Sequence, residues 1–489
     1  MNIYHKRAIF RRRDESSVYR MFFWVILILG GIWLIRSVRQ GDIKPLFLPT
    51  ATPTRFAGSY VLEAEALFTA GKLDDTKDAE GNVISNGAIS SYLEATKVDP
   101  NNAKVWADLA RVQTYSSAMI VNRDDIKARL AEALVSAEKA VELAPDDSYV
   151  HSIYAFTLDW NADSRLIEDP REISRLLQEA EQEAARALQL DNTNTLALAF
   201  SAEILVDQQK WTQADQNIKQ ALQRNASLMD VHRINAYVLE SLGEYALAIE
   251  AYDRAIAITP NLTFLYQYAG ANYRRLAFDS PNEDIQRELY EKSLDYFAQT
   301  ARINEQLGVQ DPGPYLSIAK TYSQMGEFFI AIRNVQKTIE FEPSQAELYG
   351  ELGVLYHKNR NYETGILALK CAVRGCTEEE SCAGRGECGK NDIPAVVIGL
   401  PLTNGTVYYY DIYASELAAL HKLPKNNYCP EALLVASEIE AKEFDNDPNI
   451  AADIVVVRNI CNDLPFGISA DLTPTVESAI PSAIPTATP

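Results

Sequence analysis

Residues 232–260, HRINAYVLESLGEYALAIEAYDRAIAITP, decide how the rest of the chain is interpreted. Large residues spaced by three and seven positions form one stripe over the first half, and Gly243 follows the stripe where a helix needs a C-terminal cap. Ala236 and Ala248 are small, as required where two helices cross closely. Pro260 disfavours helical geometry in the residue before it. The stretch therefore predicts a helical hairpin that ends at Pro260.

The same spacing recurs along the chain at a period of about 34 residues. Three further copies carry it, at Leu198, Ala202, Leu205, Trp211, Ala214, Ile218 and Ala221, at Tyr315, Ile318, Ala319, Tyr322, Gly326, Phe328, Ala331, Val335, Thr338 and Pro343, and at Tyr349, Leu352, Gly353, Tyr356, Tyr362, Gly365, Leu369 and Ala372. Diverged copies end near Pro100, Pro145 and Asn192, and another begins at Tyr266. Together these copies predict eight units.

This pattern resembles the tetratricopeptide repeat family over roughly residues 58–376. The resemblance implies an all-α fold, an α-solenoid of about eight helical hairpins. Four units are longer than the family length, and we expect their extra residues to lengthen turns on one edge of the solenoid. The extra residues lie at Asp74–Gly87, Val121–Arg129, Asp163–Ser174 and Ala277–Glu288.

The N-terminal region predicts a single membrane anchor. MFFWVILILGGIWLI, residues 21–35, is uncharged and lies between Arg20 and Arg36. A signal peptide is the alternative, but no small-x-small cleavage site follows the apolar run. The basic residues before it favour a cytoplasmic N-terminus and an extracytoplasmic body. We therefore expect a cytoplasmic basic stub over 1–20, an anchor in the lipid bilayer over 21–36 and a Pro/Thr linker over 37–57, in the style of a bacterial cell envelope protein.

All six cysteines follow residue 370, in a compartment that permits disulfides. Cys429 opens one amphipathic helical stretch and Cys461 ends the next, so we expect a disulfide between them to staple an antiparallel hairpin. Four more cysteines lie close together and favour disulfides over a zinc site, because the x2 spacing of zinc knuckles is missing. Their three possible pairings stay open. They are Cys371, Cys376, Cys382 and Cys388.

The C-terminal third divides into three expected parts: a Cys-rich loop over 377–405, a helical cap over 406–465 and a disordered Thr/Pro/Ser tail over 466–489. Asn404-Gly405 between apolar runs is typical of a β-hairpin, but the residues that follow have helical spacing. We favour a helix from about Val407, which forms a ninth, degenerate hairpin with Pro430–Phe444.

Composition and motifs exclude several functions. The formal charge is −21, and residues 45–489 carry 37 Lys and Arg against 64 Asp and Glu, so nucleic acid is not an expected partner. Sequence motifs for nucleotide binding, hydrolase nucleophiles and zinc proteases are missing. We expect no enzyme activity, cofactor or metal.

The inward positions of the first helices are the candidate ligand groove. Aromatic residues predominate in its N-terminal half and cations in its C-terminal half, which suits a protein partner or an acidic peptide. The family's carboxylate clamp of Lys and Asn is not reproduced, since Arg233, Tyr237, Leu316 and Lys320 occupy the corresponding places. The candidates are Arg111, Tyr115, Tyr149, Phe156, Trp160, Arg233, Tyr237, Phe264, Arg274, Arg275, Lys320, His357 and Lys358.

Three functions compete on these observations. The first is a membrane-anchored scaffold that binds peptide segments or partner proteins in the groove. The second is an envelope polysaccharide-binding module, which needs Tyr149, Phe156 and Trp160 as an exposed stacking platform. An enzyme in the C-terminal segment is the weakest, because no polar constellation converges there. The sequence leaves the oligomeric state and the identity of the partner open.

Overall fold

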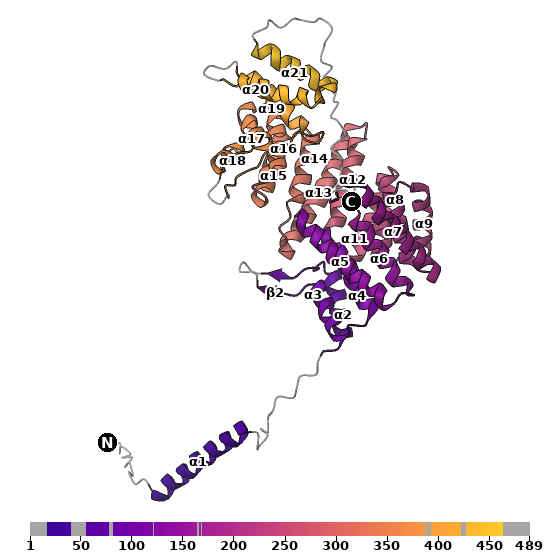
Figure 1. Ribbon diagram of the computed structural model, residues 1–489, viewed down its shortest axis with the longest axis vertical. Helices are drawn as coiled ribbons and strands as arrows, with labels where there is room; N and C mark the ends of the chain where they lie inside the picture. The colour runs from indigo at the N-terminus through magenta and orange to yellow at the C-terminus, as the bar shows by residue number, and fades with distance from the viewer. Residues whose placement is uncertain are drawn as a thin grey trace, which may run out of the picture. The chain divides into compact units, whose positions relative to one another are not determined.

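A computed structural model describes residues 17–40, 55–77, 82–120, 122–163, 166–167, 169–386, 388, 393–421 and 427–462 (Figure 1). The chain divides into two units, residues 1–55 and residues 56–489. Most of the expected basic stub, linker and C-terminal tail lies outside the described residues.

The described part of the first unit contains one helix, α1 (Val18–Gln40). Among the described residues it is the one helix long and apolar enough to cross a membrane, over Val18–Ser37, and its large apolar side chains are exposed. A signal sequence near an N-terminus has the same properties. The helix therefore lies where the sequence predicts the apolar segment. Its position is compatible with either an anchor or a cleaved signal sequence.

The second unit begins with eight consecutive helical hairpins, which confirms the predicted all-α solenoid (Figure 1). In each pair the first helix packs against the second. The pairs are α2 (Ala57–Thr69) with α3 (Ala88–Val98), α4 (Ala103–Ser117) with α5 (Arg123–Leu143), α6 (Ser148–Asn161) with α7 (Pro170–Leu190), α8 (Thr195–Asp207) with α9 (Trp211–Arg224), α10 (Met229–Ser241) with α11 (Tyr245–Ile258), α12 (Thr263–Phe278) with α13 (Glu283–Leu307), α14 (Gly313–Gln324) with α15 (Phe328–Phe341), and α16 (Ala346–Lys358) with α17 (Tyr362–Arg374).

Small residues let the two helices of a hairpin approach each other, as the repeat spacing predicts. A Cβ atom built at Gly353 on α16 would lie 2.4 Å from Cγ of Leu369 on α17. One built at Gly270 on α12 would lie 2.7 Å from the ring of Phe297 on α13. Larger side chains at these crossings would force the helices apart.

The extra residues of the four long units behave differently from the expectation. At the first insertion, the described residues 74–77 and 82–87 lie outside the helices, and β1 (Thr76–Lys77) and β2 (Val83–Ser85) pair antiparallel there. The insertion at Val121–Arg129 mostly lengthens α5, so the expectation of a longer turn was wrong there. The insertions at Asp163–Ser174 and Ala277–Glu288 lie partly in the turn and partly in the longer second helix. The reason is early N-capping, because the side chains of Asn122, Asp169 and Asn282 accept hydrogen bonds from the first backbone amides of α5, α7 and α13.

The first six hairpins close on themselves. Gly71, after α2, lies against the backbone of Asn261, which precedes α12, and a Cβ at Gly71 would come within 2.4 Å of the Asn261 carbonyl oxygen. Arg111 on α4 also reaches Asp230 on α10. Hairpin 1 therefore contacts the start of hairpin 6, and the inward faces of the first helices between them meet across the interior.

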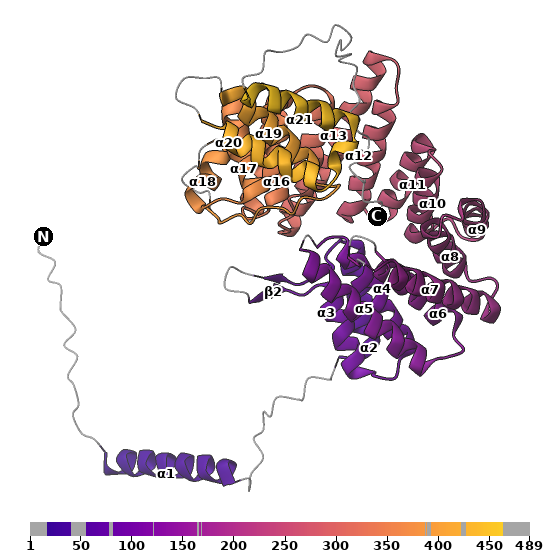
Figure 2. The same ribbon diagram turned by 45° about the horizontal axis from the view of Figure 1, so that its top comes forward.

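The C-terminal residues form a helical cap on hairpin 8. Figure 2 shows α19 (Val407–His421), α20 (Cys429–Ala441) and α21 (Pro448–Cys461) gathered beside α16 and α17. Apolar side chains from all three cap helices, such as Leu417, Val435 and Ile454, share one core with Leu369 of α17. The helix at Val407 and its pairing with α20 agree with the favoured alternative at Asn404-Gly405. A short 3-10 helix, η1 (Phe444–Asn446), connects α20 to α21.

All six cysteines are paired. Cys429 and Cys461 are bonded and staple the ends of α20 and α21, as the helix pattern predicts. The four clustered cysteines form two short-range bonds, Cys371–Cys376 and Cys382–Cys388, which settle the open pairings and leave no thiolate for zinc. The expected Cys-rich loop includes a helix, α18 (Glu378–Gly384), whose capping box joins Thr377 and Glu380.

Candidate functional site

The thirteen candidate groove residues separate into two groups with different surroundings. The group on hairpins 2 to 5 and at the start of α12 turns inward and meets in the closed interior of the first six hairpins. The group on hairpins 6 to 8 lines the first helices near the cap.

The N-terminal aromatic residues form a core. Tyr115 and Phe156 are fully buried, and Phe264 is 4% exposed. The Tyr115 ring stacks on Phe264 with centroids 5.9 Å apart, and Phe156 stacks on Phe200 at 4.4 Å. Aromatic pairs of this kind stabilise a fold beyond the area that they bury. These rings are therefore internal packing residues.

Two buried ion pairs cross the same interior. The guanidinium of Arg111 donates to both carboxylate oxygens of Asp230, with Nε to Oδ1 at 2.9 Å. Arg233 donates in the same bidentate way to Glu203, with Nη1 to Oε1 at 2.7 Å. The side chains of Arg233 and Glu203 are each 5% exposed. A buried charge is tolerated only when it is paired and hydrogen-bonded, and both conditions hold here.

Neutral groups complete this network. The hydroxyl of Tyr115 donates to Asp230 at 2.6 Å and accepts from Nε of Arg233 at 3.2 Å. The indole of Trp160 donates to Glu203 at 3.0 Å. Burial acts to raise the pKa of Asp230, but Arg111 and Tyr115 outweigh it and hold that pKa below its ordinary value. Asp230 is therefore an ionised member of a satisfied network.

The stacking platform that a polysaccharide site needs is not present at these residues. Phe156 is enclosed by Tyr115, Trp160 and Phe200. The hydroxyl of Tyr149 is bonded to Asp108, and Trp160 is held edge-on to Phe156. The exposed platform that this alternative needs is therefore not formed, because Phe156 is buried while Tyr149 and Trp160 are half-buried against internal partners.

The N-terminal candidates are therefore not groove residues. Arg111 and Arg233 are paired with Asp230 and Glu203, and Phe264 stacks on Tyr115. The hydroxyl of Tyr237 is bonded to Asp207. The acidic partners of this network were not among the predicted site residues. The sequence feature that could have revealed them is an acidic residue at an inward position of a first helix. Such a position is uncommon for an acidic residue unless a cation faces it. These partners are Asp108, Glu203, Asp207 and Asp230.

The C-terminal candidates include three half-buried cations on successive first helices: Arg274 on α12, Lys320 on α14 and Lys358 on α16. Arg274 donates to the carbonyl oxygen of Ser317 at 3.2 Å and lies over the ring of Phe297. Among the described residues, none of the three cations forms an ion pair with a carboxylate. Arg275, by contrast, is exposed and lies against Tyr245.

Burial and mutual repulsion act on these cations. Burial lowers the pKa of Lys320, and nearby Arg274 lowers it further, while Glu351 opposes both effects. Burial also lowers the pKa of Arg274 to about 10. Desolvated cations without a salt partner favour an anionic ligand, which restores the electrostatic interaction lost with water.

Glu351 and the cap define the edge of this cationic surface. Glu351 lies near Lys320 and Lys358, and it accepts a hydrogen bond from the hydroxyl of Tyr409 on α19 at 3.2 Å. His357 points to the cap, where its Nδ1 lies 3.0 Å from Glu416, a carboxylate with a 2% exposed side chain. His357 therefore belongs to the cap interface and is removed from the candidate ligand residues.

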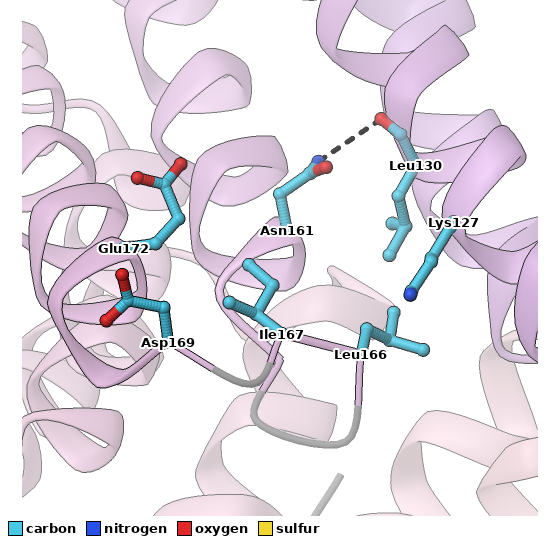
Figure 3. A pocket seen from close by; sticks show the side chains of 7 residues that line it. All are labelled: Lys127, Leu130, Asn161, Leu166, Ile167, Asp169 and Glu172. Carbon is cyan, nitrogen blue, oxygen red and sulfur yellow. Dashed lines mark hydrogen bonds between the residues drawn. The ribbon is translucent and has the colours of Figure 1, made fainter.

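A separate depression of about 570 Å³ lies beside the start of α7. Figure 3 shows the carboxylates of Asp169 and Glu172 on one side and Lys127 on the other, while Asn161 donates to the carbonyl oxygen of Leu130 at 3.2 Å. Its polar groups do not converge on one point, so it is a weaker candidate than the cationic surface. In the described part of the chain, no cluster of His, Cys, Asp or Glu has the arrangement of a metal site.

Comparison with known families agrees with the fold. Residues 201–262 match the tetratricopeptide repeat family model. This match and the eight hairpins of the same spacing support the assignment of the solenoid to the tetratricopeptide repeat family. Proteins of this class are scaffolds for protein–protein interaction and are generally not enzymes.

Individual relatives are distant. The Hsp70-Hsp90 organizing protein of Triticum aestivum is 19% identical over 251 residues, which cover 43% of this chain and 42% of the relative. The chain thus spans about two fifths of the length of that curated relative.

Solved structures that resemble this chain are also repeat proteins or assemblies of low identity. A thermophilic TPR protein of Thermus thermophilus is 16% identical, covers 44% of this chain and 98% of its own, and has a TM-score of 0.35. YrrB, a TPR protein with an unusual peptide-binding site, is 19% identical over 42% of this chain and 92% of its own, with a TM-score of 0.29. The human IFIT1 dimer with PPP-AAAA is 14% identical over 84% of this chain and 92% of its own, with a TM-score of 0.47.

Proposed function

We propose that this protein is a non-enzymatic, membrane-anchored scaffold that binds acidic segments of partner proteins on the inward face of hairpins 6 to 8. The observation that carries the proposal is the set of three half-buried cations, Arg274, Lys320 and Lys358, that lack a carboxylate partner among the described residues of a chain of charge −21. An acidic segment lying across α12, α14 and α16 supplies the missing negative charge. We name these three residues the cationic surface.

The proposal includes the anchor. Supporting it are the α1 helix, whose apolar side chains are exposed, and the basic residues that precede it. Three disulfides in the body suit an extracytoplasmic compartment. We test the topology by adding protease to intact cells that express the chain with an epitope at each end. We expect loss of the C-terminal epitope alone, and protection of the C-terminal epitope would contradict this orientation.

The binding proposal is tested by fluorescence anisotropy of the full chain in detergent with a labelled peptide of alternating Asp and Ser. We expect Lys320→Glu combined with Lys358→Glu to weaken binding at least about tenfold, because two attractive charges become repulsive. Lys219→Glu is the matched control, since Lys219 is an exposed cation on α9, outside the cationic surface.

Two outcomes would overturn the binding proposal. One is equal affinity in the double variant, the wild type and the Lys219→Glu control. The other is tighter binding of a single-stranded RNA probe that the double variant removes, because the same cations would then serve a nucleic acid. A lysine-rich peptide of equal length shows whether the interaction depends on ligand charge.

A further inference from the structure

An extended segment beside the end of α17, residues 393–400, leaves apolar side chains uncovered. Val397 is 2% exposed and exchanges two backbone hydrogen bonds with Cys376, each of 3.0 Å. Its neighbours Val396 and Ile398 are 60% and 83% exposed. One buried side chain between two exposed ones is the pattern of a strand that is covered on one face alone.

The backbone of the two exposed residues faces away from Cys376. Successive residues of an extended chain direct their N–H and C=O groups to opposite edges. Since Val397 uses the edge toward Cys376, Val396 and Ile398 direct their groups to the other edge. Among the described residues, no backbone hydrogen bond involves either of them. An open edge next to exposed apolar side chains favours pairing with a further strand.

The residues that follow α21 have the sequence of a complementary strand, although they lie outside the described part of the chain. In LPFGISADL, residues 464–472, every second residue is apolar, and Pro, Gly, Ser and Asp lie between the apolar residues. Strict alternation over this length predicts a half-buried strand. The pattern ends at Leu472, before the Thr/Pro-rich part of the tail.

Pro465 determines which edge of such a strand can pair. Proline has no N–H group, so in a strand its nitrogen must face away from the ladder. The apolar residues on either side of it then direct their backbone groups to the partner. Residues directly opposite each other in an antiparallel pair share one face, so these apolar side chains would lie against Val396 and Ile398. One arrangement therefore satisfies both the open backbone edge and the exposed side chains.

The chain leaves α21 on the side of the cap that carries the extended segment. The disulfide at the end of α21 joins it to the start of α20, with Cα atoms 5.3 Å apart. In the first turn of α20, Glu431 accepts a hydrogen bond from Nε of Arg374 at 2.7 Å. The next residue, Gly375, packs on the segment so closely that a Cβ would lie 2.6 Å from the Val397 carbonyl oxygen. Residues 463–472 reach about 33 Å when extended, which spans these few contacts.

We propose that residues 464–472 add as a strand to the open edge at Val396 and Ile398, so that the chain's own C-terminal segment covers this apolar surface. Because the segment is attached within reach, its effective concentration at the edge exceeds that of a free segment of another protein. The added strand joins hairpin 8 to the end of the cap. The proposal goes beyond the ligand binding proposed above and does not depend on it. It moves the start of the expected disordered tail from residue 466 to the residue after Leu472.

Photocrosslinking of the full chain in detergent identifies what covers the edge. The photoreactive residue p-benzoylphenylalanine replaces Phe466, and in a control chain it replaces Ile480, which lies beyond the alternating pattern. Equal amounts of isotopically heavy and light chains are mixed before illumination. We expect crosslinks from position 466 to residues 393–400 within one chain, and we expect the control position to give few of them.

Two crosslinking results would overturn the proposal. Crosslinks between heavy and light chains would show that a second copy provides the strand. Crosslinks to detergent alone, or to parts of the chain other than residues 393–400, would show that residues 464–472 do not occupy this edge.

Hydrogen exchange at single residues measures the pairing itself. It compares the wild type with two double variants of the same added charge. The first is Phe466→Asp with Ile468→Asp, within the alternating pattern. The second is Ile480→Asp with Ile484→Asp, the matched control further along the tail.

We expect the amides of Val396 and Ile398 to exchange at least about tenfold faster in the first variant than in the wild type, because their hydrogen bonds to the added strand are lost. The control should exchange as the wild type does, and unchanged protection around Val435 shows that the cap stays folded. Equal exchange of the two amides in all three chains would overturn the proposal. If the aspartates also expose α20 and α21, the crosslink alone decides between the two results.

Discussion

The guanidinium of Arg111 on α4 is joined to the carboxylate of Asp230 on α10, a residue 119 positions further along the chain. The side chain of Asp230 is 3% exposed, and that of Arg111 is 19% exposed. In a solenoid, contacts usually join neighbouring repeats. This pair instead joins hairpin 2 to hairpin 5, and it makes the first six hairpins a closed body with a polar and aromatic interior.

Removal of one partner of this pair should be costly. We expect Arg111→Ala to lower the free energy of unfolding by about 3 kcal/mol, because Asp230 is left buried and charged without its partner. Arg111→Lys should recover little of the loss, since an ammonium group does not reproduce the bidentate contact. Urea unfolding followed by circular dichroism measures both variants.

Lys219→Ala is the control for that measurement, because its ion pair with Asp215 is exposed and joins residues four apart on one helix. We expect that change to alter stability by less than about 0.5 kcal/mol. Equal losses in Arg111→Ala and Lys219→Ala would show that the pair across the interior contributes no more than a surface ion pair.

Gly71 tests the closure between hairpin 1 and hairpin 6 directly. Its φ is +72°, and a Cβ there would approach the Asn261 carbonyl oxygen to 2.4 Å. Gly243 has a similar φ of +79°, but nothing lies within 4 Å of its Cβ position. We expect Gly243→Ala to cost about 1 kcal/mol from backbone strain alone. Gly71→Ala should cost clearly more and should raise hydrogen exchange in both α2 and α12.

If the two alanine variants lose the same stability and exchange is unchanged in α12, the contact between Gly71 and Asn261 does not hold the closed body together. The comparison isolates closure because both variants carry the same strain at positive φ.

The carboxyl pair of Asp159, which is 4% exposed, and Asp207, an exposed residue at the end of α8, predicts a pH-dependent stability in the closed body. Burial raises the pKa of Asp207 to about 7, although the hydroxyl of Tyr237 opposes this, and burial with Asp207 nearby raises the pKa of Asp159. The folded state therefore retains a proton that the unfolded chain loses near pH 4. We expect the free energy of unfolding to fall as pH rises from about 4 to about 7, because only the folded state still holds this proton over that range.

Asp159→Asn should flatten that dependence, because the pair then has one acidic group. Glu288→Gln, a change at an exposed carboxylate, should leave it as in the wild type. Urea midpoints measured across this pH range test the pH dependence of stability in the wild type and in both variants. A wild-type stability that rises over the interval would mean that the pair is ionised in the folded state.

The local structure was predictable because it depends on local patterns. The spacing around Ala236, Gly243 and Pro260 predicts one hairpin, and its recurrence gives the hairpin count. The longer second helices were missed because the N-caps, such as Asn122 and Asp169, lie inside segments interpreted as insertions. Capping is decided by one side chain and is easily overlooked beside a strong repeat.

The candidate site was harder to predict for a physical reason. Whether an inward residue lines a groove or fills a core depends on small rotations between successive hairpins, which accumulate along the chain. Nothing near Tyr115 in the sequence indicates that Phe264 will stack on it. Arg274 and Lys320 were recognised as inward cations from their helix positions alone, but their lack of a carboxylate partner required the described side chains.

The last prediction concerns the disulfide between Cys429 and Cys461, which closes a segment with a sequence separation of 32. Loop closure of this length restricts the unfolded chain, so replacing both residues with alanine should destabilise the cap by about 3 to 4 kcal/mol. The same change at Cys371 and Cys376, with a separation of 5, should cost less in loop entropy. Hydrogen exchange of α20 and α21 separates the two effects.

The long-range bond also determines which helices respond. Cys429 begins α20 and Cys461 ends α21, so loss of the bond releases the two ends that lie together while η1 still connects the others. We expect exchange to rise most at the start of α20 and the end of α21, and least around Val435 in the shared core. A uniform rise across the cap would show that the bond stabilises the whole domain, and no rise would show that packing on α17 suffices without it.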